Sequence, residues 1–479
     1  MKINAYYTTL QKSEHTMDGN FMDTAVRGRL GEGANGCVVS PPFLCSSKPD
    51  TSKEYSEPDT SIESASLSAT NATVSAFPHK YVCKLLRNNR AADLEKELSD
   101  RVRSIDPDGH YSVTALERCR SDPIRKSSIK RACPVLSATK YKDSNQTMEF
   151  PMLIYANGGP SMEANAHSGM YSQRDLIKSL YNIVTEGLPA LAAAEVIHMD
   201  IKADNLVMPE KTDAKLIDFG NSSTFKDGAL PSSLVFKSLE PRFPPEIYLL
   251  RTGTPRPELK RHKVRRFVSG EVEEHFPMIE SKIRLGKFGR EFYNLRTLSQ
   301  KTLKAIYGLL FIDTFDLYSL SWMVADFLSN PGYKFKPTDT FTQDEYNKLV
   351  IWLRNTLADN AFNRWGNLES AEYWPVIWDG TVKYATAERL EVSLSNNARE
   401  RMTKAIRTKV FDGELPDEYN PVNLYRTLSH ATDSAAFRGA QAYATGGKKT
   451  LVRKTRRSRS KTRRRSSSRR SSSYRKIRK

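Results

Sequence analysis

Cysteine is scarce in this chain of 479 residues, which has five cysteines, and no two of them show C-x-x-C spacing. The odd number argues against a disulfide framework, and the missing spacing argues against a zinc site. We therefore predict reduced thiols, as in an intracellular protein, at Cys37, Cys45, Cys83, Cys119 and Cys133.

Long apolar runs are also missing. The longest one, near Leu188–Ile197, is interrupted by Pro189 and Glu195 and is shorter than the roughly 20 residues that a membrane helix needs. The first residues do not form the apolar run of a signal peptide. We expect a soluble protein without membrane contact, located in the cytoplasm or nucleus.

Acidic residues are absent from the C-terminal segment, residues 448–479, which contains 17 Lys and Arg. The net charge of +19 therefore falls to +2 for the rest of the chain. Like charges at this density repel one another, which predicts a disordered tail that binds nucleic acid or another polyanion without sequence specificity. A nuclear-localisation signal, a packaging signal and a phosphoacceptor region are alternative interpretations of this tail.

Large apolar residues are nearly absent from residues 46–75, where 13 of 30 residues are Ser or Thr. Such a segment cannot support a packed core, and we expect a disordered insertion. Around it the pattern favours strands, namely a hairpin of Val26–Leu30 with residues 37–39, and the segments Tyr81–Leu86 and Phe150–Tyr155.

Helical periodicity appears at Ala91–Ile105 and then dominates after residue 170, at Tyr171–Ala194, Leu317–Leu328 and Glu345–Leu357. A strand-rich first part and a helix-rich second part predict an α+β protein with two lobes.

A glycine-rich segment begins at Leu30, ends at Val38 and has the pattern G-x-G-x-x-G-x-V, with Gly31, Gly33 and Gly36. Glycine allows the backbone to approach phosphate oxygens closely, although a tight hairpin turn without a ligand would have the same composition. A dinucleotide-binding motif is excluded, because a strand and not a helix follows the glycines. The segment predicts a hairpin that covers a phosphate group.

Lys84 lies within an apolar strand, where a lysine is costly unless it pairs with an anion or points to solvent. A carboxylate on the next helix would hold the ammonium group in place against a phosphate. Glu95 and Glu97 compete for this role, and we predict Glu97.

The string His-Met-Asp-Ile-Lys-Ala-Asp-Asn-Leu begins at residue 198 and carries the most chemical information. In phosphoryl transfer Asp200 would accept the proton of the substrate hydroxyl, Lys202 would stabilise the transferred phosphate, and Asn205 would bind a metal ion. A polar surface loop is the alternative. Asp218-Phe219-Gly220 follows at a strand end and supplies a second metal-binding carboxylate.

These motifs, in this order, make the sequence similar to the eukaryotic-type protein kinase superfamily. The resemblance covers about Val26–Leu328 and implies ATP and Mg²⁺ as cofactors. It also implies that Leu153 is the gatekeeper and that the backbone of Ile154 and Ala156 faces the adenine.

Two further segments resemble kinase features. Pro244-Pro245-Glu246 resembles the end of the activation segment, and residues 316–320 resemble the start of the buried helix that anchors the catalytic loop. The position of Lys202 is the serine/threonine-type choice, which implies protein substrates with Ser or Thr acceptors. The Pro-Pro-Glu ending and the short His-Met-Asp-Ile-Lys string resemble those of kinases of large DNA viruses. A viral protein would be located in the virion or the host cell.

The resemblance gives the domain organisation. Residues 1–25 form a lead-in, residues 26–430 a kinase domain with a strand-rich N-lobe and a helical C-lobe, and residues 431–479 a linker and the Arg/Ser-rich tail. Insertions are expected at about 41–79 and 250–312, and the second contains a basic run that could dock acidic substrates or nucleic acid or could simply be solvated.

One departure from the family matters for regulation. Met199 replaces the arginine that normally precedes the catalytic aspartate, which argues against activation through a phosphate bound by that arginine. The alternative function is a pseudokinase scaffold that binds nucleic acid or acidic partners through the basic tail. An active kinase is the preferred prediction, because Lys84, Asp200, Asn205 and Asp218 are all present.

Overall fold

The computed structural model describes residues 28–33, 36–46, 78–137, 146–209, 213–224, 242–244, 300–358 and 364–411. The chain divides into two units, Met1–Leu428 and Ser429–Lys479, and all described residues belong to the first unit. The predicted lead-in and basic tail lie outside the described residues, as do residues 47–77 and 250–299 of the two predicted insertions.

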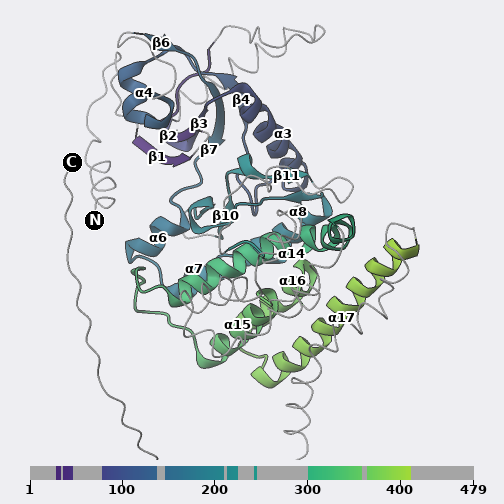
Figure 1. Cartoon of the computed structure of the whole chain (residues 1–479). Helices are drawn as coiled ribbons and strands as arrows, with labels where there is room; N and C mark the ends of the chain where they lie inside the picture. The colour runs from purple at the N-terminus through teal and green to yellow at the C-terminus, as the bar shows by residue number, and fades with distance from the viewer. Residues whose placement is uncertain are drawn as a thin grey trace, which may run out of the picture. The chain divides into compact units, whose positions relative to one another are not determined.

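The first half of this unit contains a five-stranded antiparallel sheet in the order β1-β2-β3-β7-β4 (Figure 1). Its strands are β1 (Gly28–Gly33), β2 (Gly36–Ser40), β3 (Tyr81–Leu86), β4 (Glu117–Arg120) and β7 (Pro151–Ala156). The short helix η1 (Pro78–Lys80) leads into β3. The predicted hairpin and the strand over Tyr81–Leu86 are confirmed.

The two faces of the sheet pack against different layers because strand side chains alternate. On the inner face, Val82, Leu86 and Tyr155 form a buried cluster with Ala92 of helix α3 (Asn89–Ile105). The outer face is covered by residues 43–45 and by a small cap. The cap consists of the hairpin β5 (Ile124–Arg125) and β6 (Thr147–Met148) and the helices α4 (Lys126–Ala132) and α5 (Pro134–Ser137).

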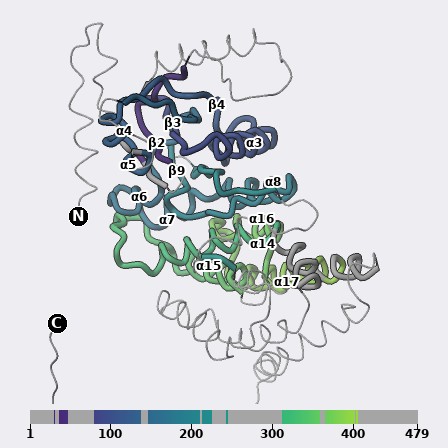
Figure 2. The backbone as a smooth tube through the Cα atoms, turned by 45° about the horizontal axis from the view of Figure 1, so that its top comes forward, coloured from purple at the N-terminus to yellow at the C-terminus, as the bar shows by residue number. Residues whose placement is uncertain are grey.

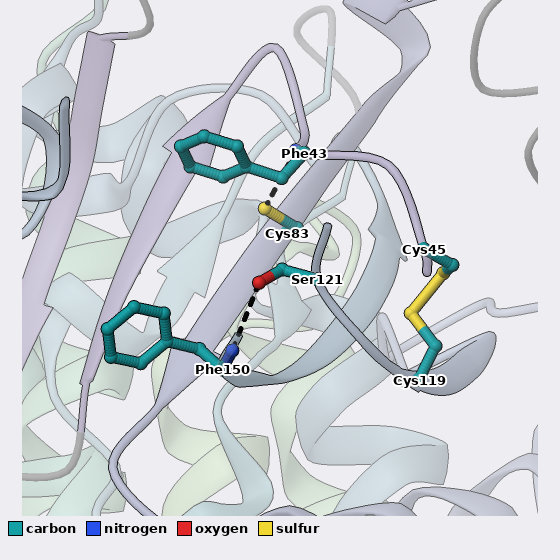
Figure 3. Close-up of a disulfide and its surroundings, with 6 residues drawn as sticks. All are labelled: Phe43, Cys45, Cys83, Cys119, Ser121 and Phe150. Atoms are coloured by element: carbon teal, nitrogen blue, oxygen red, sulfur yellow. Dashed lines mark hydrogen bonds between the residues drawn. A yellow bond between two sulfur atoms is a disulfide. The ribbon is translucent and has the colours of Figure 1, made fainter. Parts of the chain in front are cut away.

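Two disulfides tie this outer layer together, so the prediction of reduced thiols is wrong for four cysteines. Cys37 is bonded to Cys133, with Cα atoms 5.5 Å apart. Cys45 is bonded to Cys119, with Cα atoms 5.7 Å apart. Figure 3 shows the second of these disulfides. Cys83 keeps its thiol, which is buried and accepts a hydrogen bond from the N–H of Phe43. The cysteines therefore no longer support an intracellular location.

The second half is mainly helical. Its elements are α6 (Met162–Ser168), α7 (Gln173–Lys178), η2 (Ile183–Gly187), α8 (Leu188–Ala193), β8 (Val196–Ile197), η3 (Ala203–Asn205), β9 (Leu206–Val207), β10 (Lys215–Leu216), η4 (Phe219–Asn221), β11 (Ser223–Thr224), α14 (Gln300–Ser329), α15 (Gln343–Thr356), α16 (Asn367–Trp378) and α17 (Tyr384–Phe411). Figure 2 shows α14, α15 and α16 grouped away from the sheet.

The core of the helical half is rich in aromatic residues. Trp352 of α15 and Trp374 of α16 are fully buried, with ring centroids 4.6 Å apart. The predicted helix over residues 171–194 is divided into α7, a π-helical turn and α8. Residues 300–312, which were expected to end an insertion, belong to α14. Within the described residues, no helix is long and apolar enough to cross a membrane.

Candidate active site

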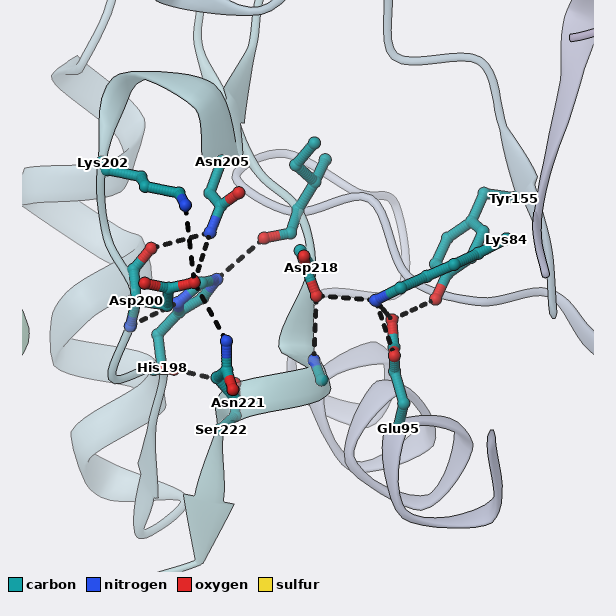
Figure 4. A network of polar contacts seen from close by, with 12 residues as sticks. Lys84, Glu95, Tyr155, His198, Asp200, Lys202, Asn205, Asp218, Asn221 and Ser222 are labelled. Atoms are coloured by element: carbon teal, nitrogen blue, oxygen red, sulfur yellow. Dashed lines mark hydrogen bonds and ion pairs between the residues drawn. The ribbon is translucent and has the colours of Figure 1, made fainter. Parts of the chain in front are cut away.

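Three elements meet at the Lys84 ammonium group. Lys84 is on the central strand β3, and its side chain is 11% exposed. Its Nζ atom lies 2.7 Å from both carboxylate oxygens of Glu95 on α3 and 2.7 Å from Oδ1 of Asp218 (Figure 4). The hydroxyl of Tyr155 on β7 donates to Glu95 at 2.6 Å. One cation therefore connects the sheet, the helix α3 and the loop that follows β10.

The charges in this cluster shift one another's pKa values. Burial disfavours the charged form of Lys84, but the carboxylates of Asp218 and Glu95 outweigh burial and raise its pKa. Burial likewise opposes ionisation of Asp218, yet Lys84 lowers the pKa of Asp218 to about 2. At Glu95 burial prevails and raises the pKa. Lys84 and Asp218 therefore form a charged pair at neutral pH.

The prediction that Glu97 pairs with Lys84 is wrong. Glu95 is buried and contacts Lys84, whereas Glu97 is exposed. Two residues along a helix correspond to a rotation of about 200°, so only one of the two side chains can face the sheet. The buried positions Ala92, Glu95, Ser99 and Val102 follow the spacing of one helix face and would have identified Glu95.

The glycine-rich segment forms the hairpin of β1 and β2, which places Gly31 and Gly33 on β1 and Gly36 at the start of β2. A Cβ atom at Gly36 would lie 1.9 Å from the carbonyl oxygen of Leu85 on β3, so no other residue fits without a backbone shift. Leu30 is exposed, whereas Val38 packs against the inner cluster beside Val82. The hairpin thus forms the edge of the sheet next to β3, and Val38, paired with Lys84, lies on the same face of the sheet.

Asp200 lies in the loop between β8 and β9 and is buried. Its Oδ2 atom accepts hydrogen bonds from the side-chain amides of Asn205, at 3.1 Å, and Asn221, at 3.0 Å. Asn205 also donates to the carbonyl oxygen of Asp200 at 2.8 Å. Lys202, which is partly exposed, has its Nζ atom 3.9 Å from Oδ2. The predicted catalytic string therefore converges on one carboxylate (Figure 4).

Helix α14 holds this loop from beneath. Asp316 accepts hydrogen bonds from the N–H groups of His198, at 2.6 Å, and Met199, at 2.9 Å. Met199 is buried and has a φ of 62°, a backbone conformation that is uncommon for residues other than glycine. Two bonds to one carboxylate hold the backbone at this turn.

Asn205 and Asp218 lie on adjoining segments, because the N–H of Ile217 donates to the carbonyl oxygen of Asn205 at 3.0 Å. The amide nitrogen of Asn205 is engaged by Asp200, which leaves its Oδ1 atom as an acceptor on the other side of the group. In the described part of the chain, no three His, Cys, Asp or Glu residues gather into a metal site. Two oxygen donors suit Mg²⁺, which usually keeps water ligands and takes others from substrate phosphates.

Sequence reasoning missed two residues next to Asp200. Asn221 directly follows the Asp218-Phe219-Gly220 motif, and this position gave the only signal for it. Arg242 places Nη2 2.6 Å from Oδ1 of Asp200, although 42 residues separate the two along the chain. No local motif marks Arg242. Of the Pro244-Pro245-Glu246 motif that follows it, the structure describes only Pro244.

The predicted adenine contact at Ile154 is also wrong. Ile154 is in the middle of the sheet, paired with Cys83 on β3 and Glu117 on β4, and its carbonyl oxygen accepts from the N–H of Leu116 at 2.7 Å. Tyr155, one residue later, projects into the inner face beside Glu95, and Leu153, paired with Lys84, belongs to the same buried cluster. Ala156, at the end of β7, is exposed. Of the two backbone contacts that the sequence predicts, only Ala156 lies where the strand ends, two residues after Ile154.

Comparison with known proteins shows that part of this chain matches a protein family. Residues 135–240 match the protein kinase domain. The serine/threonine-protein kinase GRIK2 of Arabidopsis thaliana is 32% identical over 119 residues, which are 24% of this chain and 29% of that protein. The chloroplastic serine/threonine-protein kinase STN8 of the same plant is 33% identical over 85 residues, 17% of each chain. The chain thus spans less than a third of either relative.

Proposed function

The chain carries a protein kinase domain of the eukaryotic type, and from this premise we propose that it transfers the γ-phosphoryl group of Mg-ATP to Ser and Thr hydroxyls of proteins. The domain would have the two-lobed kinase fold, with the sheet and α3 as the N-lobe. Bound ATP would supply the phosphoryl group, and Mg²⁺ would offset its charge.

Each polar residue of the site has a role in this proposal. Asp200 accepts the proton of the acceptor hydroxyl as that oxygen bonds to phosphorus, and ADP is the leaving group. Lys202 stabilises negative charge on the transferred group. Lys84, held by Glu95, would bind phosphate oxygens, and Asn205 and Asp218 would hold the metal ion.

The observation that carries the proposal is the convergence of Lys84, Asp200, Asn205 and Asp218 from separate elements. The glycine-rich hairpin beside β3 supports it, because glycine lets the backbone approach phosphate oxygens closely. The adenine would meet the segment beginning at Ala156, where Gly158 packs closely against Val207 of β9.

The test is a phosphoryl-transfer assay with labelled ATP, Mg²⁺ and basic and acidic protein substrates. Asp200→Asn should lower transfer by at least about 100-fold, because general base catalysis contributes roughly 10²- to 10⁴-fold. ATP binding should persist in this variant. Asp204→Asn is the matched control, because Asp204 is exposed on the same turn and should leave activity unchanged.

The labelled product should contain phosphoserine and phosphothreonine with little phosphotyrosine, because Lys202 occupies the serine/threonine-type position. Two results would refute the proposal, namely absence of transfer by the wild-type protein and equal transfer by wild type and Asp200→Asn. Predominant phosphotyrosine would overturn only the assignment of the acceptor.

A further inference from the structure

Arg242 forms the shortest of the described contacts to the Asp200 carboxylate, with Nη2 2.6 Å from Oδ1. The Arg242 side chain is 13% exposed and that of Asp200 10%, so solvent screens the pair only partly. A charged hydrogen bond in this environment is stronger than one at the surface. This pair therefore fixes the rotation of the Asp200 side chain.

The contacts described at Asp200 leave one acceptor site on Oδ1 for a substrate hydroxyl. A carboxylate has about four lone-pair sites, two on each oxygen. Asn205 and Asn221 both donate to Oδ2, whereas Arg242 donates to Oδ1. An acceptor hydroxyl can therefore donate to the second site of Oδ1 while Arg242 stays in place. The guanidinium group would then lie beside the hydroxyl that is being phosphorylated.

Arg242 is itself held by helix α14. Its carbonyl oxygen accepts from the hydroxyl of Ser319 at 3.0 Å, and its guanidinium group lies 5.5 Å from the centroid of the Phe243 ring. Phe243 in turn packs on Phe315 of α14, with ring centroids 5.6 Å apart. The same helix supplies Asp316, which fixes the backbone before Asp200. One rigid element thus sets both partners of the ion pair.

The residue before Asp200 cannot supply such a charge. Met199 is apolar and fully buried, so it offers no cation to a phosphorylated side chain. Arg242 brings a permanent cation to the catalytic loop from a segment 42 residues later. Unlike a phosphate, this contact needs no prior modification of the chain.

Building on the proposed function, we infer that Arg242 is a positioning residue. Its ion pair holds Asp200 in the orientation needed for transfer and links the segment at 242–244 to the catalytic loop without phosphorylation. Removal of the pair should reduce turnover, because a misplaced base costs up to about 100-fold in rate. Nucleotide affinity should not change, because Arg242 contacts the general base Asp200 and not the cluster around Lys84.

The experiment compares Arg242→Gln and Arg242→Lys with the wild-type full chain, each before and after phosphatase treatment. The kcat value and the KM values for ATP and for the protein substrate are measured. Arg174→Gln is the matched control, because Arg174 forms a partly buried pair of the same 2.6 Å length with Glu345 of α15. Asp200→Asn sets the background, and thermal unfolding checks that each variant is folded.

We expect Arg242→Gln to lower kcat by roughly 10- to 100-fold with the KM for ATP changed less than about twofold. Arg242→Lys should recover part of kcat, because lysine keeps the charge but lacks the planar fork. Arg174→Gln should keep wild-type kcat, and phosphatase treatment should leave the wild type active.

A kcat of Arg242→Gln equal to or above that of the wild type would overturn the inference. An increase would mean that the ion pair with Arg242 hinders Asp200 as the general base. Loss of activity after phosphatase treatment would also overturn it. If Arg242→Gln does not fold, Arg242→Lys provides the test. A kcat of Arg242→Lys as low as that of Asp200→Asn would exclude a role for the positive charge alone. An inactive wild type, or an active Asp200→Asn, would instead refute the proposed function itself.

Discussion

At the residue scale, Lys84 is the point on which the cluster of Glu95, Asp218 and Tyr155 depends. Both of its carboxylate partners lie 2.7 Å away, and without the ammonium group two negative charges would face each other on the inner side of the sheet. Like charges at short range repel strongly where water is largely excluded. Lys84 therefore holds Asp218 in position, in addition to the role proposed for it in binding phosphate.

We predict that Lys84→Met lowers phosphoryl transfer by roughly 100-fold or more and weakens ATP binding, because the main electrostatic contact is lost. Lys96→Met is the control, since Lys96 is on the same helix as Glu95 but pairs with Asp100 at the surface. Transfer assays and nucleotide titrations measure both effects. Full activity in Lys84→Met would show that phosphate binds elsewhere.

The residues that could be predicted from sequence are those in local strings. Asp200, Lys202 and Asn205 share one loop, so their spacing alone indicates that they act together. Partners brought in by tertiary structure were harder to predict. Arg242 reaches Asp200 through the packing of Phe243 on α14, which no local pattern encodes.

At the element scale, the cap on the outer face of the sheet is bonded to the hairpin of β1 and β2. Cys37 directly follows Gly36 on β2, and its disulfide to Cys133 connects this strand to the turn between α4 and α5. The Cys45–Cys119 disulfide belongs to the same buried layer but is anchored on β4. The two bonds thus differ in whether they hold the hairpin.

We expect Cys133→Ser and Cys119→Ser each to lower the free energy of unfolding by about 2–4 kcal/mol, the usual contribution of a disulfide. Only Cys133→Ser should also raise the KM for ATP, because only that bond restrains β2. Thermal unfolding and ATP titrations of the kinase reaction test this. An equal rise of KM in both variants would mean that the whole layer, and not the hairpin bond, is responsible.

Gly36 gives a second test of the hairpin. Alanine there would place a methyl group against the backbone of Leu85, which has to move, and should cost about 1–3 kcal/mol of stability. Gly380→Ala is the control, because nothing lies within 4 Å of a Cβ atom at Gly380. Chemical denaturation of the two variants should separate them, and equal stability would show that the hairpin adapts without cost.

The elements themselves were largely predictable, because strands such as Tyr81–Leu86 and the helix near residues 91–105 follow regular periods. The cysteine pairs were not. Each joins residues 96 or 74 positions apart, and counting cysteines says nothing about which strands a cap brings together. The odd number of cysteines did not exclude disulfides, because one buried thiol, Cys83, accompanies two bonded pairs.

At the scale of the whole molecule, charge is distributed very unevenly. The residues after Gly447 carry 17 of the 19 net positive charges, and the remainder of the chain is close to neutral at +2. Electrostatic binding to a polyanion scales with the number of phosphates neutralised, so this segment should dominate such binding. Catalysis on a short peptide depends on the site and should not require it.

We predict that a chain ending at Gly447 loses most of its affinity for DNA or RNA and keeps its peptide kinase activity. Affinity of the full chain should fall steeply with salt, with a slope of about 0.9 for each duplex phosphate contacted. Binding isotherms at low and moderate salt, for both chains, give the answer. Salt-insensitive binding, or equal affinity after truncation, would move the contact to the basic run near residues 251–266.

Helix α14 has a consequence for the order in which the candidate site can form during synthesis of the chain. The carboxylate that fixes the backbone before Asp200 is Asp316, 118 residues from His198, and Ser319 of the same helix holds Arg242. The segment that matches the kinase family, residues 135–240, contains neither anchor. A nascent chain therefore cannot position its base until residues through Ser319 have left the ribosome and α14 has docked. We therefore expect a fragment that ends before α14 to lack the contacts that hold the backbone before Asp200 and the segment of Arg242.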